Sequence, residues 1–192
     1  MTASPSSPAG AEWLRLDRQI CFSLHAASRA FNGVYRVILK DLGLTYPQYL
    51  VMLVLWEQGD LPVKKLGEQL RLDSGTLSPL VKRLEGAGLV HRERSAQDER
   101  SVQVRLTGEG AALRERALQV PRRIMGATGF DLEEIADLRE RLDQLTTALD
   151  AAALAEAARE ADQPTRAADG REPDHARRAV RSPRPAGSPP AR

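Results

Sequence analysis

One cysteine and two tyrosines are the residues best suited to chemistry. Cys21 is the only cysteine in the chain, so it cannot form an intramolecular disulfide. Tyr35 and Tyr46 follow at spacings from which their phenolic hydroxyls could converge on the Cys21 sulfur. A thiolate attacks a peroxide oxygen, and hydrogen-bond donors aimed at the sulfur stabilise that charged form. The three residues therefore suggest an oxidant-sensitive thiol; the alternative is an inert buried cysteine beside two tyrosines of an amphipathic core.

The spacing between Cys21 and Tyr35 limits how their side chains could meet. Fourteen residues of continuous helix give a rise of roughly 21 Å, although a rotation of about 1400° returns both residues to nearly the same face. Tyr35 therefore cannot reach Cys21 along one straight helix. A second copy of the chain, related by a two-fold axis, could supply the tyrosine, which predicts a thiol site across a homodimer interface. A bend at Asn32-Gly33 is the alternative, and it would keep the contact within one chain.

Apolar periodicity predicts the helices that carry these residues. A long first helix should begin near Trp13, because apolar residues recur at helical spacing from there onward: Leu16, Ile20, Leu24, Ala27, Phe31, Val34 and Ile38. Thr45 and Gln48 form a capping box for a second helix that ends near Glu57, with Pro47 in its first turn. This second helix is apolar almost all round, so we expect it to be central and buried.

Two more helices are predicted near the end of the folded region. Thr107 should cap a helix that continues to about Met125. Asp131 with Glu134 is a second capping signal, and the helix that follows has an apolar stripe formed by Leu132, Ile135, Leu138, Leu142, Leu145 and Leu149.

The segment between these helices reads as a helix-turn-helix followed by a β-hairpin. A short helix over Val63 to Leu70 is joined by a three-residue turn to a second helix, which begins after Asp73 and runs to about Glu85. Two alternating strands follow, over residues 89–94 and 102–106, with a polar loop of residues 95–101 between them. The fold class is therefore mainly α with a small β-hairpin, a winged helix-turn-helix.

This arrangement predicts DNA contacts, because the start of the second helix enters the major groove in helix-turn-helix docking. Lys82 and Arg83, further along, suit phosphates, and Arg100 near the loop tip suits a narrow minor groove unless it is a solvated residue paired with Asp98. Pro79 should bend the helix unless its missing hydrogen bond is offset. The candidate DNA-binding residues are Asp73, Ser74, Gly75, Thr76, Ser78, Pro79, Lys82, Arg83, Arg94, Asp98 and Arg100. A winged helix that binds protein instead is the alternative.

Length and composition suggest one domain with extensions at both ends. The 192 residues are 42% hydrophobic but only 4% aromatic, and the net charge of +2 is too small to indicate a nucleic-acid binder by itself. Residues 61–106 carry nine basic and six acidic side chains, a mild local excess. We expect residues 1–11 to be disordered, residues 12–160 to form the folded domain with its winged helix at about 61–107, and residues 161–192 to be a disordered tail.

Several classes of protein are disfavoured. The N-terminus lacks the basic and apolar regions of a signal peptide, and the longest apolar run is eight residues, which predicts a cytoplasmic protein without a membrane partner. One cysteine and three histidines show no metal-ligand spacing, and we expect no cofactor. A thiol peroxidase is conceivable, but no second cysteine or paired carboxylate accompanies Cys21, so we expect no enzyme activity.

Four stretches resemble the MarR family and, within it, the organic hydroperoxide resistance regulators. They are QICFSLHAASRAF, LTYPQYLVMLVLWE, VKKLGEQLRLDSGTLSPLVKRLEGAGLV and SAQDERSVQVRLT, and the match runs from about Asp17 to Arg123. The resemblance implies a homodimeric repressor, with dimerisation helices from both termini, whose reduced form binds a palindromic operator. It implies that peroxide oxidises Cys21 and DNA is released, that Tyr35 and Tyr46 are hydrogen-bond partners of the thiol, and that Arg100 enters the minor groove.

Two departures from the family pattern bear on the mechanism. Some relatives carry a second, resolving cysteine near the start of the last helix, where this chain has Gly126 to Gly129 without one. A sulfenic acid at Cys21 could then react with a low-molecular-weight thiol, condense with a backbone nitrogen or oxidise further. His25 stands where close relatives can carry a tyrosine, and a solvated helix-face histidine is the simpler interpretation. A MarR-type repressor released by a small aromatic ligand is the alternative function.

Overall fold

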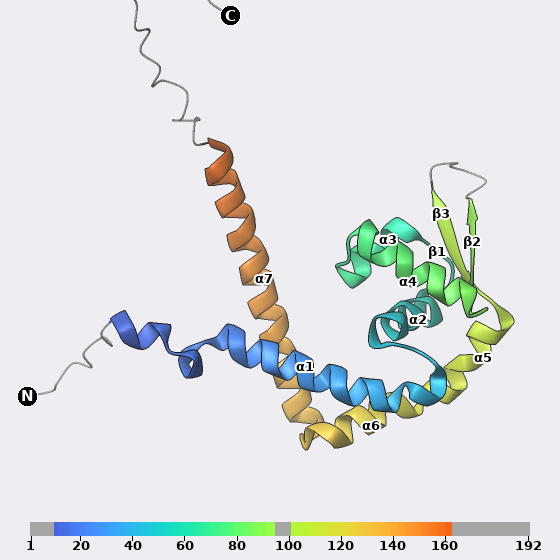
Figure 1. Ribbon diagram of the computed structural model, residues 1–192, viewed down its shortest axis with the longest axis horizontal. Helices are drawn as coiled ribbons and strands as arrows, with labels where there is room; N and C mark the ends of the chain where they lie inside the picture. The colour runs from blue at the N-terminus through green and yellow to red at the C-terminus, as the bar shows by residue number, and fades with distance from the viewer. Residues whose placement is uncertain (1–9, 95–100, 163–192) are drawn as a thin grey trace, which may run out of the picture. The chain divides into compact units, whose positions relative to one another are not determined.

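The computed structural model describes residues 10–94 and 101–162, which form helices and one small sheet (Figure 1). The predicted disordered N-terminus lies outside these residues except for Gly10 and Ala11, and the tail lies outside them from residue 163. The chain divides into two compact units, one up to Glu134 and the other from Ile135 onward. The prediction of a mainly helical fold with a small antiparallel sheet is confirmed.

The elements of the first unit begin with two short 3-10 turns and a long helix. In chain order they are η1 (Gly10–Leu14), η2 (Leu16–Arg18), α1 (Ile20–Ile38), η3 (Lys40–Leu42), α2 (Tyr46–Gln58), β1 (Leu61–Pro62), α3 (Val63–Leu70), α4 (Ser74–Gly86), β2 (Val90–Arg94), β3 (Val102–Leu106), α5 (Gly108–Ala117) and α6 (Gln119–Thr128). The last helix, α7 (Leu132–Asp162), begins at the end of this unit and forms the described part of the second. No helix within the described ranges has both the length and the apolarity to cross a membrane.

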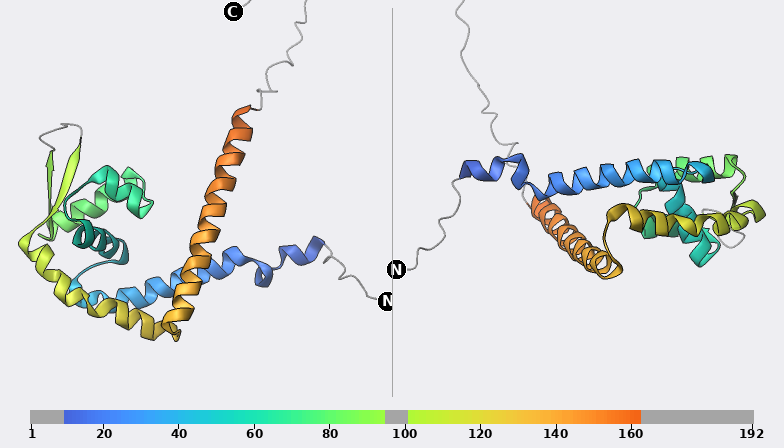
Figure 2. Two further views of the ribbon diagram at one scale, coloured as in Figure 1. Left: turned by 180° about the vertical axis from the view of Figure 1, so that it is seen from behind. Right: turned by 90° about the horizontal axis from the view of Figure 1, so that it is seen from below.

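Helix α2 is the centre of the core, as its apolar sequence predicts. Its start is the expected capping box: the backbone N–H and the hydroxyl of Thr45 both donate to Gln48 Oε1 at 2.9 Å. Val51 and Met52 are fully buried, and α2 packs between α1 on one side and α3 and α4 on the other (Figure 1). Helix α6 runs beside α1 (Figure 2).

The winged helix agrees with the predicted elements and adds one strand. Strands β2 and β3 pair antiparallel with Val90 opposite Leu106, and β1 pairs with the other edge of β3. The turn between α3 and α4 is tight: a Cβ on Gly67 would lie 2.8 Å from the carbonyl oxygen of Leu72. The absent side chain of Gly67 therefore permits the close helix-turn-helix approach.

The first helix begins later than the apolar pattern predicts, and it is not bent. Trp13 lies in a 3-10 turn and is 64% exposed, while Arg15 and Gln19 have extended backbones that interrupt the helical path before Ile20. Helix α1 then continues without a break through Gly33. The Asn32 side chain donates to the Ser28 carbonyl one turn back (2.9 Å), so its amide does not compete with the helix backbone.

The single helix predicted from Thr107 to about Met125 is in fact two. Helix α5 ends at Ala117 and α6 begins at Gln119, with Leu118 between them. Pro121 has no N–H to donate to the Ala117 carbonyl four residues back, and its ring crowds that carbonyl. The division falls at the residue where proline removes the helical hydrogen bond.

Helix α7 begins with the predicted capping pair. Asp131 Oδ1 accepts from the backbone N–H groups of Glu133 and Glu134, and Glu134 Oε2 accepts from the Asp131 N–H, all at 2.9 Å. The helix runs for 31 residues.

Candidate DNA-binding surface and thiol site

The start of α4 is held by Asp73. Its Oδ1 accepts from the backbone N–H of Thr76 at 2.9 Å, and its Oδ2 accepts from the Thr76 hydroxyl at 2.8 Å. These two donors, the backbone N–H first, lower the pKa of the Asp73 carboxyl below its ordinary value. Asp73 is therefore the N-cap of α4, and its carboxylate is already engaged within the chain.

The remaining α4 residues divide into a buried and an exposed face. Leu77, Leu80, Val81 and Leu84 are buried against the core. The other predicted candidates on this helix are exposed: Ser74, Gly75, Thr76, Ser78, Pro79, Lys82 and Arg83. Short hydroxyl side chains therefore occupy the first turns, and the two cations follow toward the helix end.

Pro79 does not interrupt α4. The helix is continuous from Ser74 to Gly86, with Pro79 in its second turn. The hydrogen bond that Pro79 cannot donate would go to the carbonyl of Gly75, which is exposed and can be hydrated. A Cβ on Gly75 would lie 3.0 Å from Asp73 Oδ1, so glycine also leaves room for the cap.

The hairpin carries one of its three predicted DNA-binding residues within the described chain. Arg94 ends β2, is exposed, and lies on the same side of the strand as Val90 and Arg92, because alternate residues share a face. Asp98 and Arg100 lie outside the described residues.

The two tyrosines predicted to support the thiol lie together. The rings of Tyr35 on α1 and Tyr46 on α2 stack with centroids 4.3 Å apart, and both side chains are half-buried. Burial, followed by the proximity of Tyr46 and Tyr49, raises the pKa of Tyr35 to about 12, and burial also raises the pKa of Tyr46. Both phenols thus remain neutral hydrogen-bond donors at physiological pH.

Cys21 is not brought to these tyrosines within the chain. It is exposed in the first turn of α1, where the positive end of the helix dipole favours negative charge. Because α1 is unbroken, the rise from Cys21 to Tyr35 is roughly 21 Å. The bend at Asn32-Gly33 that would have allowed a contact within one chain is absent. His25 is exposed one turn beyond Cys21.

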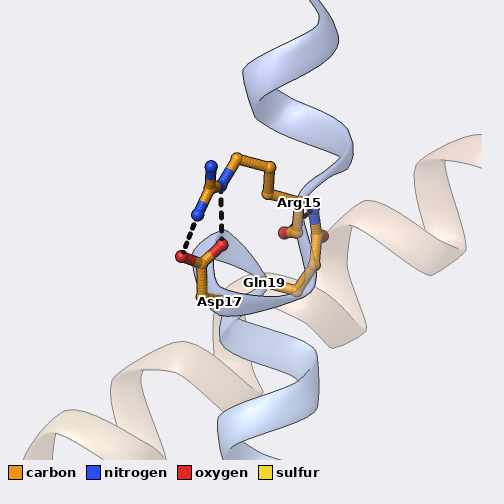
Figure 3. Close-up of polar contacts among 3 residues, drawn as sticks. All are labelled: Arg15, Asp17 and Gln19. Atoms are coloured by element: carbon orange, nitrogen blue, oxygen red, sulfur yellow. Dashed lines mark hydrogen bonds and ion pairs between the residues drawn. The ribbon is translucent and has the colours of Figure 1, made fainter.

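Local polar contacts organise the segment just before Cys21 (Figure 3). Arg15 Nε and Nη2 donate to the two carboxylate oxygens of Asp17 at 3.0 and 2.8 Å. The side-chain amide of Gln19, the N-cap residue of α1, donates back to the carbonyls of Trp13 and Arg15 instead of capping the helix. The chain direction entering α1 is therefore set by side chains adjacent to the cysteine.

Tyr49 and Trp56 extend the tyrosine pair in a way that the sequence reasoning missed. Tyr49 is buried, with its ring centroid 6.1 Å from that of Tyr35 and 6.2 Å from that of Trp56. Trp56 Nε1 donates to the carbonyl of Gly110 on α5 at 2.8 Å. The available signal is the spacing along α2, where Tyr49 follows Tyr46 by three residues and Trp56 follows Tyr49 by seven, which places these rings on one side of the helix.

Within residues 10–94 and 101–162, no group of three or more His, Cys, Asp and Glu side chains is arranged to hold a metal ion.

Comparisons with known proteins agree with this fold and these motifs. The chain is 47% identical over 136 residues to the organic hydroperoxide resistance transcriptional regulator of Bacillus subtilis, covering 71% of this chain and 92% of that protein. It is also 47% identical over 138 residues to the HTH-type transcriptional regulator TtmR of Methylorubrum extorquens, covering 72% of this chain and 71% of that protein. A family model described as transcriptional regulator SarA/Rot matches residues 33–116.

A solved structure of a related regulator was determined on DNA. The structure of reduced AbfR bound to DNA is similar with a TM-score of 0.61 and 37% identity, covering 72% of this chain and 96% of that chain. The winged helix and these relatives define a DNA-binding transcriptional regulator. The chain belongs to the MarR family, in the group of the organic hydroperoxide resistance regulators, with a single cysteine.

Proposed function

We propose that this regulator is a homodimeric repressor that binds a palindromic operator when Cys21 is reduced and releases it when an organic hydroperoxide oxidises Cys21. The observation that carries the proposal is the stacked pair of neutral phenols, Tyr35 and Tyr46, on a chain whose one thiol is exposed. The B. subtilis relative, named for organic hydroperoxide resistance, supports the same chemistry.

The Cys21 thiolate attacks the outer peroxide oxygen, the O–O bond breaks, and one proton from solvent completes an alcohol while the sulfur becomes a sulfenic acid. A low-molecular-weight thiol then displaces hydroxide from that sulfur, which yields a mixed disulfide and water. Tyr35 and Tyr46 donate to the thiolate before the attack and hold it in the reactive form.

The unbroken α1 supports a site shared between two chains. A tyrosine roughly 21 Å from Cys21 along its own helix can donate to a sulfur only if that sulfur belongs to another copy. In a two-fold dimer, Cys21 of each copy would meet the tyrosine pair of the other. Oxidation would then add bulk between the copies and change the separation of the two α4 helices, which must match half-sites about 34 Å apart.

On DNA, we assign base reading to the first turns of α4 and phosphate contact to its later cations. Ser74, Gly75, Thr76 and Ser78 are exposed at the end that enters the major groove, beside Pro79. Asp73 contributes by capping the helix. Lys82 and Arg83 suit phosphates, Arg94 continues the basic surface on the hairpin, and Arg100 with Asp98 would serve at the wing.

The test is DNA release by cumene hydroperoxide, measured by fluorescence anisotropy on a duplex selected from a random pool by the reduced protein. We expect Cys21→Ser to bind this duplex like wild type but to remain bound after peroxide. Tyr35→Phe and Tyr46→Phe should each slow release by about 10- to 100-fold, since a hydrogen bond to a charged group contributes about 1.5–3 kcal/mol. Tyr49→Phe is the matched control, because the Tyr49 side chain is buried within the chain and should not affect the rate.

Release of Cys21→Ser at the wild-type rate would exclude the thiol mechanism. Mixed heterodimers, in which one copy carries Cys21→Ser and the other carries Tyr35→Phe, test the shared site directly. If the site is shared, the intact cysteine meets the unaltered tyrosine pair of the other copy and one complete site remains. If the site lies within a chain, the intact cysteine meets the altered tyrosine pair. Oxidation of the remaining cysteine at the wild-type rate supports the shared site, and slow oxidation contradicts it.

A hollow beside the same aromatic residues supports the alternative, a repressor released by a small aromatic ligand. The hollow has a volume of about 460 Å³, and Tyr49, Trp56, Leu118 and Arg114 are among the residues that line it. Rings and an arginine suit an aromatic carboxylate. If the Cys21→Ser variant releases DNA when such an acid is added without peroxide, this function is favoured over the first.

A further inference from the structure

A charged pair joins the end of the DNA-reading helix to the hairpin. Arg92 Nε on β2 donates to Glu85 Oε2 on α4 at 2.8 Å, and Arg92 Nη2 lies 2.6 Å from the same oxygen. The backbone N–H of Arg92 donates to the other carboxylate oxygen, Glu85 Oε1, at 3.1 Å. Both side chains are about one-third exposed. The carboxylate of Glu85 is thus bound at both oxygens by one residue of the hairpin.

The connection below this pair is already closed by backbone hydrogen bonds. The N–H of Leu89 donates to the Leu84 carbonyl at 3.0 Å, and the N–H of Gly88 donates to the Glu85 carbonyl at 2.9 Å, with Gly88 at a φ of 74°. This turn fixes the start of β2 against the end of α4. It does not by itself fix the direction of β2 beyond Val90: β1 pairs with β3 at Val104 and Gln103, whereas β2 lies at the other edge of the sheet, where an edge strand can twist. The Glu85–Arg92 pair holds β2 two residues beyond Val90, where twisting of the strand would move it relative to α4.

The Glu85–Arg92 pair lies between the buried base of the hairpin and its exposed end. Val90, Arg92 and Arg94 alternate onto one side of β2, with Val90 buried and Arg94 exposed at the strand end. Arg92 also lines the hollow of about 650 Å³ between α3, α4 and the hairpin. Rotation of the hairpin about its base would move Arg94 relative to the exposed face of α4.

We infer that Glu85 is a positioning residue for operator binding: by holding Arg92 it sets the angle of the hairpin to α4, so that both elements reach their grooves together. In this assignment Arg92 is engaged with Glu85 rather than with a phosphate. The inference rests on DNA binding alone and is independent of the redox proposal, so the oxidation of Cys21 plays no part in its test.

A second ion-pair set on the opposite face of the hairpin is a matched control. Arg105 on β3 contacts Asp60 at 2.9 Å and Glu93 on β2 at 3.5 Å. Glu93 neighbours Arg92 in sequence but points to the other side of β2. Glu93→Gln therefore removes one negative charge, as Glu85→Gln does, but from β2 and without releasing the hairpin from α4.

The experiment measures the affinity of the reduced, full-length protein for the duplex selected from a random pool, as a function of salt concentration. We expect Glu85→Gln to bind about fivefold more weakly, because a charge-assisted pair is lost and the hairpin samples other angles. The dependence on salt should stay like that of wild type, since no phosphate contact is removed. Glu93→Gln should show no loss of affinity, and the unfolding midpoints of the two variants should agree.

A charge exchange distinguishes positioning from direct phosphate contact. In the double variant Glu85→Arg with Arg92→Glu, the side-chain ion pair is rebuilt with its ends reversed, while the backbone N–H of residue 92 loses its carboxylate acceptor. We expect affinity to return to within about twofold of wild type, because the side-chain pair sets the hairpin angle. If Arg92 instead bound a phosphate, the exchange would abolish binding, and Glu85→Gln would leave affinity unchanged or increase it by freeing the arginine. Either of those two results overturns the inference. Hydroxyl-radical footprints should also show that Glu85→Gln loses protection at the flanks contacted by the hairpin and retains it at the α4 contact.

Discussion

The winged helix and the N-terminal half of α1 differ in how much of their structure one chain completes. Leu66, Leu84 and Val90 in the winged helix are fully buried, and the turn, cap and hairpin are closed by hydrogen bonds within the chain. On α1, Ile20 is 66% exposed and Cys21 beside it is exposed. The DNA-reading part is therefore finished within one polypeptide, whereas the thiol region offers apolar side chains that one chain leaves uncovered. The proposed thiol site could therefore depend on a second copy without disturbing the fold of the winged helix.

The largest expected effect tests how tightly the winged helix is closed. A methyl group at Gly110 would overlap the backbone of Leu89, and the Gly110 carbonyl accepts the Trp56 indole hydrogen bond. We expect Gly110→Ala to destabilise the protein by more than about 4 kcal/mol, measured by urea unfolding, because a backbone overlap cannot be relieved by a side-chain rotation.

Gly86→Ala is the control for this substitution. It also lies in a helix, and a Cβ there would meet nothing within 4 Å. We expect it to raise stability by up to about 1 kcal/mol. Equal unfolding midpoints for the two alanine variants would show that the contact between α5 and the hairpin is loose. The winged helix would then not be more tightly closed within one chain than the N-terminal half of α1.

The next effect compares a residue from each region directly. Leu84→Ala removes a side chain that is fully buried within the chain, so we expect a loss of about 2–5 kcal/mol in urea unfolding. Ile20→Ala should lower the free energy of unfolding of the monomer by less than about 1 kcal/mol, because Ile20 is largely exposed within one chain. It should, however, weaken self-association measured by sedimentation equilibrium. If Ile20→Ala leaves association unchanged, the exposed face of α1 is not the surface that a second copy covers.

The smallest effect concerns the tyrosine pair at alkaline pH. Burial raises the pKa of Tyr35 from 10.0 to about 12, so the folded protein keeps a proton that the unfolded chain releases near pH 10. The contribution to stability is complete below pH 10 and is lost as the pH rises toward 12. We expect urea midpoints to fall over this range, and to fall less steeply for Tyr35→Phe. If the urea midpoint falls equally steeply with pH in the variant and in wild type, the Tyr35 hydroxyl is exposed to water and its pKa is not raised by burial.

Much of the winged helix was predictable because its signals are local. Asp73 and Thr76 form the α4 cap, Thr45 and Gln48 form the α2 capping box, and Leu77 and Leu84 alternate at helical spacing toward the core; each requires only residues within a few positions. Strand β1 was missed, because two residues, Leu61 and Pro62, have no periodicity and become a strand only by pairing with β3.

Errors arose where a local pattern met a competing one. The apolar residues from Trp13 onward have helical spacing, but the side chains of Arg15, Asp17 and Gln19 make local hydrogen bonds that delay the helix to Ile20. Pro121 was read as part of a continuing helix, although it divides α5 from α6. Gly33 was considered a possible bend, but a glycine with helical neighbours costs a helix only about 1 kcal/mol.

The sequence by itself determined most of the helices, both strands of the hairpin and the identity of the chemical groups: one thiol, two phenols, and a capped helix with hydroxyls at its start. Only the tertiary structure decided which of these groups meet. It stacked Tyr35 on Tyr46, added Tyr49 and Trp56 to that stack, and tied Glu85 to Arg92 across two elements. It also left Cys21 exposed at the far end of a straight helix. The reason is physical: helical periodicity and capping depend on neighbours in the chain, whereas a contact between elements depends on how their faces pack.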